Sequence, residues 1–238
     1  WIRMPNWLGD VVMAIPLLQA LRVSRPDAEL TLLCRPQFHP LLELLEIGDV
    51  VKTLPPKGTL DYFLKFIPWR SEFPDLHLLL TNSLRGDLEA FLIGATQRFG
   101  LRLPGRPRCL LTHVHRPAPE TLGQLKTLHQ TRLWEQMMQH FGLEVELPQK
   151  PFSLPGATKI TNKIGLISGA SNNPSKRWPP EKWVQLCKSI LKQSPAVTIH
   201  LYGTQADREA TDAIADKLPK GKVRNEAGST DLGQLAKE

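Results

Sequence analysis

The sequence has few cysteines and no long apolar run. Its three cysteines form no Cys-x-x-Cys pair, which fits a reducing cytosol, and we expect all three to be buried small hydrophobic side chains. They are Cys34, Cys109 and Cys187. No run of about 18 apolar residues occurs, so no membrane-spanning helix is predicted. The opening residues lack the apolar stretch and cleavage site of a secretory signal, and no Met precedes Trp1. The chain is therefore expected to begin within an element.

The composition is that of a globular protein with a basic charge balance. Of the 238 residues, 41% are hydrophobic and 22% are charged. Lys and Arg number 30 against 23 Asp and Glu, which gives a formal charge of +7. Such a charge favours anionic partners: nucleic acid, an anionic membrane face or phosphorylated substrates. A basic nucleic-acid-binding module stays open as a different class of function, although no helix-turn-helix, RRM or zinc-finger signature is present.

Short apolar runs alternate with helical patterns along the chain. Strand followed by helix, repeated, predicts parallel strands joined by crossover helices, and therefore an α/β protein. The predicted strands are 30–34, 50–54, 76–80, 164–167 and 197–202, and the predicted helices are 10–24, 36–45, 84–93, 125–141, 180–193 and 206–218. A further helix opens at Leu232. Prolines cluster between residues 148 and 156, which predicts a linker and two domains, 1–150 and 151–238.

The segment from Pro5 to Met13 has a strand end, a glycine turn and a helix start. Ligands bind at such carboxyl edges in open α/β sheets. Gly9 permits close backbone approach, and Asp10 lies where the helix begins. The simpler interpretation is that Asp10 is only a helix N-cap. The positive end of the helix dipole should keep its carboxylate ionised, so a role as a general base is chemically open.

Three further strand ends carry small polar loops. The longest, 168–183, contains Lys176 and Arg177 before a helix, so hydroxyls, backbone N–H groups and a Lys converge where a phosphate could bind. It lacks the P-loop spacing, and a solvated Lys-Arg pair is the alternative. The other two segments, 201–207 and 225–232, are weak signals alone, and each could be a turn with an N-cap. Together the three edges outline a crevice the size of a nucleotide.

Several segments resemble the lipopolysaccharide heptosyltransferases of glycosyltransferase family 9. The opening 4–18 is similar to the start of that family, and its Asn-Trp-Leu-Gly-Asp form resembles type II in particular. Thr81-Asn82-Ser83-Leu84-Arg85, His129-Gln130 and Lys176-Arg177-Trp178-Pro179 resemble family segments in the same order, as does the turn 228–232. The family continues with a strand and an Asp-[Thr/Ser]-Gly-x-x-His turn that is not in this chain, so a fragment is expected.

The resemblance implies a GT-B fold, in which two Rossmann-like domains with parallel sheets face each other across a cleft, the second being incomplete here. It implies an inverting transfer of L-glycero-D-manno-heptose from ADP-heptose, without a metal, to an inner-core sugar (heptosyl-Kdo₂-lipid A). A related acceptor such as Kdo₂-lipid A, or another nucleotide sugar, is the alternative. It also implies a cytoplasmic monomer at the inner, anionic membrane face of a Gram-negative-type bacterium, with no nucleic-acid partner.

Matching position by position, the resemblance assigns Asp10 as the general base and divides the other candidates between the two substrates. The donor candidates are Ser171, Asn172, Lys176, Gln205 and Thr230. The acceptor candidates are Asn6, Trp7, Gly9, Asn82, Ser83 and Arg85. Gln205 departs from the family, which often has an acid near that position to bind the ribose; an amide can still bond a hydroxyl.

Other side chains are weaker candidates. Four arginines could line the approach of an anionic acceptor, although a solvated loop is the simpler interpretation. They are Arg102, Arg106, Arg108 and Arg116. The aromatic residues 63, 66 and 69 could lie near the acceptor lipid, but core packing is favoured. His113 and His115 have no third ligand at a useful spacing, so no metal site is predicted.

Overall fold

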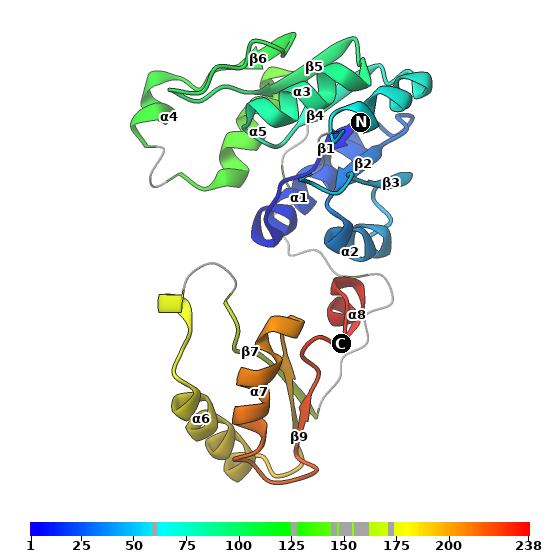
Figure 1. Ribbon diagram of the computed structural model, residues 1–238. Coiled ribbons are helices and arrows are strands. Elements are labelled where there is room, and N and C mark those ends of the chain that lie inside the picture. The colour runs from blue at the N-terminus through cyan, green and yellow to red at the C-terminus, as the bar shows by residue number, and fades with distance from the viewer. Residues whose placement is uncertain (59–60, 125–127, 144–146, 148–153, 155–161, 171–173) are drawn as a thin grey trace. The chain divides into compact units, whose positions relative to one another are not determined.

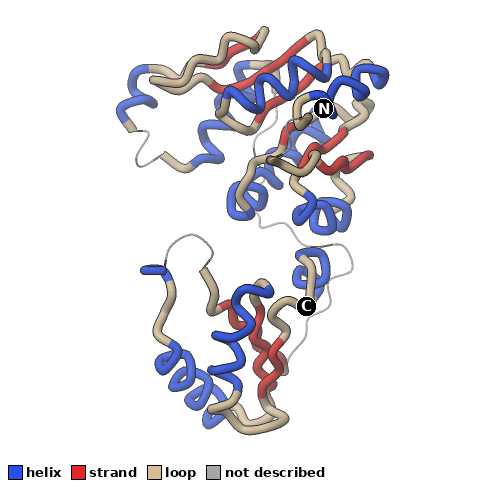
Figure 2. The backbone as a smooth tube through the Cα atoms, viewed as in Figure 1, coloured by secondary structure: helices blue, strands red, loops and turns tan. Residues whose placement is uncertain are grey.

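The chain folds into two compact units. A computed structural model describes residues 1–58, 61–124, 128–143, 147, 154, 162–170 and 174–238. The units are Trp1–Pro155 and Gly156–Glu238 (Figure 1). The predicted domain boundary between residues 150 and 151 lies outside the described residues. Each unit contains its own parallel sheet (Figure 2).

The first unit contains a six-stranded sheet in the order β3-β2-β1-β4-β5-β6, and every neighbouring pair is parallel. Its central strands are buried on both faces, as continuous apolar runs predict. All four residues of β2 are buried, for example. The strands are β1 Ile2–Arg3, β2 Thr31–Cys34, β3 Val50–Thr53, β4 Leu76–Leu79, β5 Gln97–Leu101 and β6 His113–His115.

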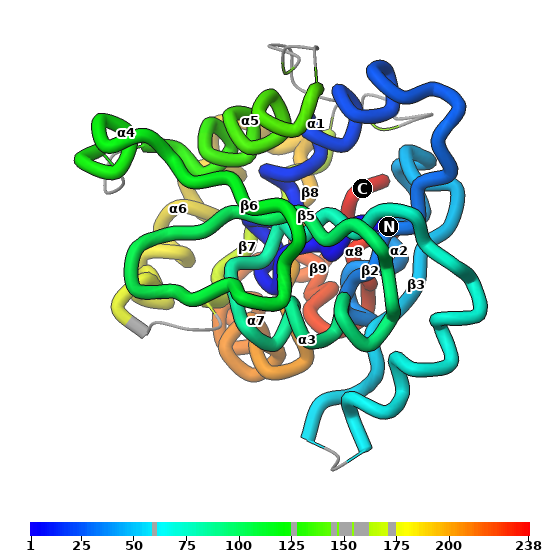
Figure 3. The backbone as a smooth tube through the Cα atoms, turned by 90° about the horizontal axis from the view of Figure 1, so that it is seen from above, coloured from blue at the N-terminus to red at the C-terminus, as the bar shows by residue number. Residues whose placement is uncertain are grey.

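Helices cover both faces of this sheet. Helix α1 packs with α5 on one face, and α3 packs with the 3₁₀ segment η2 on the other (Figure 3). The helical elements are α1 Leu8–Ser24, η1 Pro36–Phe38, α2 His39–Leu44, η2 Leu64–Glu72, α3 Leu84–Ile93, α4 Pro119–Gly123 and α5 Gln130–His140. The predicted helix over 125–141 begins later, at Gln130, because His129 is extended and accepts a hydrogen bond from the Thr131 N–H as its N-cap.

The second unit contains a three-stranded parallel sheet, ordered β7-β8-β9. Its core includes Cys187 of α6, Ile199 and Leu201 of β8, and Ile214 of α7. The elements are β7 Lys163–Ile167, η3 Pro174–Lys176, α6 Pro180–Gln193, β8 Thr198–Tyr202, η4 Gln205–Asp207, α7 Arg208–Ala215, β9 Val223–Asn225 and α8 Leu232–Lys237. The predicted helix over 206–218 is therefore shorter than expected. No helix in the described part of the chain is apolar and long enough to span a membrane.

Candidate active site

A cleft of about 350 Å³ lies at the carboxyl ends of β1, β4 and β5 in the first unit. Its position follows from the topology, since parallel strands end at one edge and the loops that follow them meet there. Five of the predicted residues line it: Asn6, Trp7, Asp10, Asn82 and Ser83. Gly9 and Arg85 do not line it. Gly9 faces open space, so its packing within the first unit does not require a glycine.

Asp10 is the third residue of α1, and Trp7 is the N-cap. The N-cap interpretation of Asp10 is therefore wrong. Its carboxylate has no hydrogen-bond partner among the described residues, and partial burial raises its pKa above the ordinary value. This direction opposes the helix dipole, which alone would lower the pKa. A carboxylate with a raised pKa and unused lone pairs is suited to accept a proton.

The other predicted acceptor-side residues have mixed surroundings. Ser83 is the N-cap of α3, because its Oγ accepts a hydrogen bond of 3.3 Å from the Gly86 N–H. Arg85 is exposed on the first turn of α3. Asn82 is half-buried, and its backbone carbonyl accepts a hydrogen bond of 2.8 Å from Arg106 Nη1.

The four candidate arginines separate into three environments. Arg106 lines the cleft with Asp10. Arg102 and Arg116 line another hollow, of about 240 Å³. Arg108 is only 3% exposed and pairs with Asp87, so both interpretations, a contact with the acceptor and a solvated loop, are wrong for this residue. A buried guanidinium needs a carboxylate partner, and here α3 provides it.

Sequence reasoning missed a second buried ion pair beside the cleft. Arg3 of β1 is 2% exposed and bonds Glu89 of α3 at 2.7 Å. The Tyr62 hydroxyl donates to the other oxygen of Glu89 at 2.6 Å. Burial and the Glu89 carboxylate together raise the pKa of Tyr62 above its ordinary value. The signal in the sequence was a charged residue, Arg3, between the apolar Ile2 and Met4, where a central strand ends.

The remaining candidates are mostly structural. Phe66 is fully buried in a cluster that Phe63 and Trp69 flank, which confirms core packing. Cys34 and Cys187 are buried as predicted, but Cys109 is exposed, so that prediction was wrong for one of the three. Among the described residues, no group of three or more His, Cys, Asp and Glu side chains is placed to hold a metal ion.

In the second unit, the loops after β7, β8 and β9 lie close together. The Asp207 Oδ2 accepts hydrogen bonds from the Thr204 N–H at 2.9 Å and from the Thr204 hydroxyl at 2.6 Å. The bond from the Thr204 N–H and a reciprocal one from the Asp207 N–H to the Thr204 side chain form a capping box at η4. A Cβ on Gly169 would lie 2.5 Å from the Asp207 carboxylate, so a larger residue there would have to displace that side chain. The Gly228 N–H donates to the Gly203 carbonyl at 2.9 Å, which joins the last two loops.

These loops hold the predicted donor residues. Lys176 ends η3 and is exposed, and the neighbouring Arg177 donates to the Ala170 carbonyl at 3.1 and 3.2 Å. Gln205 begins η4 and is exposed, and Thr230 is half-buried just before α8. The candidates Ser171 and Asn172 lie outside the described residues. An exposed Lys beside convergent loops at a sheet's carboxyl edge can bind a phosphate group.

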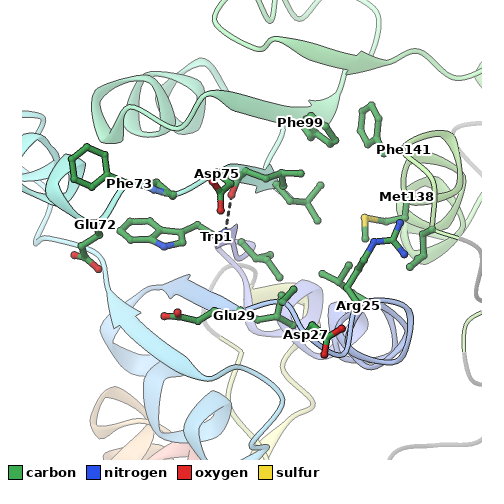
Figure 4. Close-up of a pocket in the computed structure, with 18 residues that line it drawn as sticks. Trp1, Arg25, Asp27, Glu29, Glu72, Phe73, Asp75, Phe99, Met138 and Phe141 are labelled. Atoms are coloured by element: carbon green, nitrogen blue, oxygen red, sulfur yellow. Dashed lines mark hydrogen bonds between the residues drawn. The ribbon is translucent and has the colours of Figure 1, made fainter.

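A larger cavity, of about 480 Å³, lies at the other edge of the first sheet (Figure 4). Trp1, Phe99 and Phe141 contribute apolar surface, and Asp27 and Glu29 lie on its rim (Figure 4). None of the predicted site residues lines it. Because ligands in open α/β sheets bind at the carboxyl ends of the strands, the smaller cleft is the better candidate.

Comparisons with known proteins agree with this fold. The family described as glycosyltransferase family 9 (heptosyltransferase) matches residues 70–237. Lipopolysaccharide heptosyltransferase 2 of Salmonella typhimurium is 27% identical, over 97% of this chain and 71% of that protein. The enzyme of the same name from Escherichia coli K12 is 26% identical, over 97% of this chain and 71% of that protein.

Two solved structures share the fold. The structure of E. coli ADP-heptose lps heptosyltransferase II has a TM-score of 0.79 at 23% identity, covering 98% of this chain and 74% of its own. E. coli heptosyltransferase WaaC with ADP has a TM-score of 0.74 at 14% identity, covering 99% of this chain and 77% of its own. The predicted GT-B fold class is thereby confirmed. The chain belongs to glycosyltransferase family 9, the heptosyltransferases, and is a glycosyl-transferring enzyme.

Proposed function

We propose that this enzyme transfers L-glycero-D-manno-heptose from ADP-heptose to the inner core of lipopolysaccharide, with heptosyl-Kdo₂-lipid A as acceptor. The observation that carries the proposal is the unpartnered Asp10 carboxylate in a cleft at the carboxyl edge of the first sheet. The similarity to two heptosyltransferases named type 2 supports the acceptor assignment. The nearest alternative is a family 9 enzyme that uses Kdo₂-lipid A or another nucleotide sugar.

The proposed reaction is a direct displacement with inversion at the anomeric carbon. Asp10 takes the proton of the attacking acceptor hydroxyl, a contribution typically of about 10²–10⁴-fold in rate. The new bond forms between that oxygen and the anomeric carbon, while the bond to the β-phosphate oxygen breaks and ADP leaves with the electron pair. The transition state has oxocarbenium character, as in glycoside hydrolysis.

The second unit is proposed to bind the donor. Lys176, with Ser171 and Asn172, would contact the diphosphate, where positive charge stabilises the negative charge that grows on departing ADP. Gln205 would bond a ribose hydroxyl, and the backbone near Thr230 would contact adenine. Since Lys176 supplies the positive charge, we propose that no metal is needed.

The acceptor is anionic and lipid-linked, which suits the protein's charge of +7. We propose that the enzyme is a cytoplasmic monomer that touches the anionic inner face of the membrane. Arg106, which lines the cleft, is the arginine best placed to meet a phosphate or carboxylate of the acceptor. Flotation with anionic and neutral vesicles tests the membrane contact, and sedimentation equilibrium tests the monomer.

The deciding experiment is ADP release by the full chain given ADP-heptose and a purified acceptor. Release with heptosyl-Kdo₂-lipid A, retained in EDTA, is expected. Release with Kdo₂-lipid A alone would reassign the acceptor, and loss of release in EDTA would refute the metal-independent mechanism. No release with either acceptor would refute the proposed substrates.

A further inference from the structure

Asn82 lines the cleft, and a buried ion pair holds its side chain. Its Oδ1 accepts a hydrogen bond of 2.9 Å from Arg108 Nη1. The rest of that guanidinium is bound by Asp87, with Nε and Nη2 donating at 2.7 to 2.9 Å. Both side chains of the pair are fully buried. Arg108 therefore cannot reach a ligand itself, but it fixes the direction of the Asn82 amide.

Asn6, on the neighbouring loop after β1, is held in the same way. Its Oδ1 accepts hydrogen bonds from Arg3 Nη2 at 3.2 Å and from Arg35 Nε at 3.3 Å. Arg3 is itself bound by Glu89 at 2.7 Å. Two asparagines of one cleft thus share one arrangement. In each case a buried arginine donates to the amide oxygen, and a carboxylate of α3 pairs with that arginine.

The chemistry of arginine fixes which way each amide faces. A guanidinium only donates hydrogen bonds, so the atom that faces it must be the amide oxygen and not the NH₂ group. The NH₂ group of each asparagine therefore points away from its arginine. In Asn82 this nitrogen is buried and has no partner among the described residues. A buried donor without a partner is costly, so it is expected to meet a ligand or a water molecule.

We infer that the two α3 ion pairs orient the amides of Asn6 and Asn82 as donors that bind the acceptor sugar next to Asp10. Arg3 and Arg108 are thus positioning residues. Asp10 accepts the proton of the attacking hydroxyl, and the amides donate to neighbouring oxygens of the same sugar. Because the two amides can only donate hydrogen bonds to the sugar and Asp10 accepts one, the arrangement selects which hydroxyl of the sugar lies against the base. The inference rests on the proposed function, because it names the acceptor-binding groups of that site.

The first test replaces the donor without disturbing the arginine. Asn82→Asp keeps an oxygen for Arg108 and removes the NH₂ group. Loss of one hydrogen bond should raise the KM for heptosyl-Kdo₂-lipid A by about tenfold and leave the KM for ADP-heptose unchanged. Asn6→Asp tests the second amide in the same way. An unchanged acceptor KM in both variants would overturn the inference.

The second test asks whether Arg108 acts through Asn82. Arg108→Lys keeps the charge beside Asp87 but loses the fork that reaches Asn82, so the acceptor KM should rise. In an Asn82→Ala background the same change should add nothing, because the group that it orients is already gone. Arg98→Lys is the matched control, since Arg98 bonds two backbone carbonyls away from the cleft. An equal effect of Arg108→Lys in both backgrounds would show a purely structural role.

A third measurement needs no turnover. In protein labelled with ¹⁵N-asparagine, the side-chain NH₂ signals of Asn82 should lie away from the shifts of a free asparagine side chain, and they should move toward those shifts in Arg108→Lys but not in Arg98→Lys. Unchanged signals in Arg108→Lys would refute the orientation. If the NMR signals show that the amides are held but the enzyme releases no ADP with either acceptor, the proposed function is refuted, whereas the orientation of the amides by the ion pairs still holds.

Discussion

Removing Asp87 should destabilise the first unit more than removing the whole ion pair. In Asp87→Leu the Arg108 guanidinium stays fully buried without a counter-charge, which typically costs about 3–5 kcal/mol. It keeps its bonds to the Asn82 side chain and the Leu101 carbonyl, and neither partner is charged. Against a typical total stability of about 5–15 kcal/mol, this loss is large enough to populate the unfolded first unit.

The double variant Asp87→Leu/Arg108→Met removes both charges. Apolar replacement of a buried pair is often neutral or stabilising by about 1–4 kcal/mol. The double variant leaves two acceptors, Asn82 Oδ1 and the Leu101 carbonyl, without a donor, at about 1–3 kcal/mol for each one that stays dry. Asn82 is half-buried, so the net loss should be about 1–2 kcal/mol, smaller than in the single variant.

Hydrogen exchange read by mass spectrometry is the suitable assay, because two units need not unfold in one step. Amides of β4 and α3 report the first unit, and amides of β8 and α7 serve as the internal control. Protection of β4 and α3 should fall in the single variant and recover in part in the double variant. A double variant as unstable as the single, or a single variant that loses less than about 1 kcal/mol, would refute the argument from an unpaired buried charge.

Three other predictions concern the proposed base, the donor site and the stability of the second unit. Burial raises the pKa of Asp10 above its ordinary value, and only the carboxylate form accepts a proton, so activity should rise with pH through that raised pKa. Asp10→Asn should abolish ADP release at every pH, and an active variant would contradict the assignment. Lys176→Ala should weaken ADP binding by roughly 10- to 100-fold in calorimetry, as loss of a charge-assisted hydrogen bond implies, and unchanged affinity would make the residue a bystander. Gly228→Ala should lower the stability of the second unit by more than Gly221→Ala does. Both glycines have φ near +80°, but only the Cβ at 228 would lie 2.2 Å from the Gln205 Oε1 and 3.0 Å from the Gln205 Cα. Equal losses of hydrogen-exchange protection in the two variants would show that backbone strain alone is responsible.

The elements that the sequence predicts well are those with runs of apolar residues or a clear helical pattern. The strands β2, β3, β4, β7 and β8 coincide with predicted apolar runs, and α3 and α6 match their predicted bounds. The strands β5 and β6 were missed, and β9 was expected only as a strand end before the segment 225–232. All three contain polar or charged residues, such as Arg98 and Arg224, that break an apolar run. These segments form strands because a neighbouring strand offers hydrogen-bond partners, and the local sequence pattern carries no information about that neighbour.

The position of the candidate cleft could be predicted where the sequence shows the ends of strands. Asn6 and Asn82 follow strands that turn out to be neighbours, so their meeting with Asp10 follows from the order of the sheet. Of the ion pairs behind them, only Arg3 left a signal, as a charged residue between the apolar Ile2 and Met4. Its partner Glu89 and the pair of Arg108 with Asp87 were not predictable, because a charged residue in a helix or loop looks like a surface residue. Arg108 shows this most clearly: it lies in a run of arginines and prolines, yet it is buried against Asp87.

The number of arginines is therefore a poor guide to where anions bind. Arg3 and Arg108 are two of the 30 Lys and Arg residues, but each is buried and paired with a carboxylate of α3, so the two pairs add nothing to the formal charge of +7. Neither contributes much to the field that an approaching anion meets, since a closely paired charge acts as a dipole whose field falls off rapidly. In the cleft, the exposed guanidinium of Arg106 faces the same space as the Asp10 carboxylate. In this cleft an anionic acceptor should therefore meet a cation, two amide donors and a base, and this set of contacts suits a charged sugar better than a polyphosphate backbone.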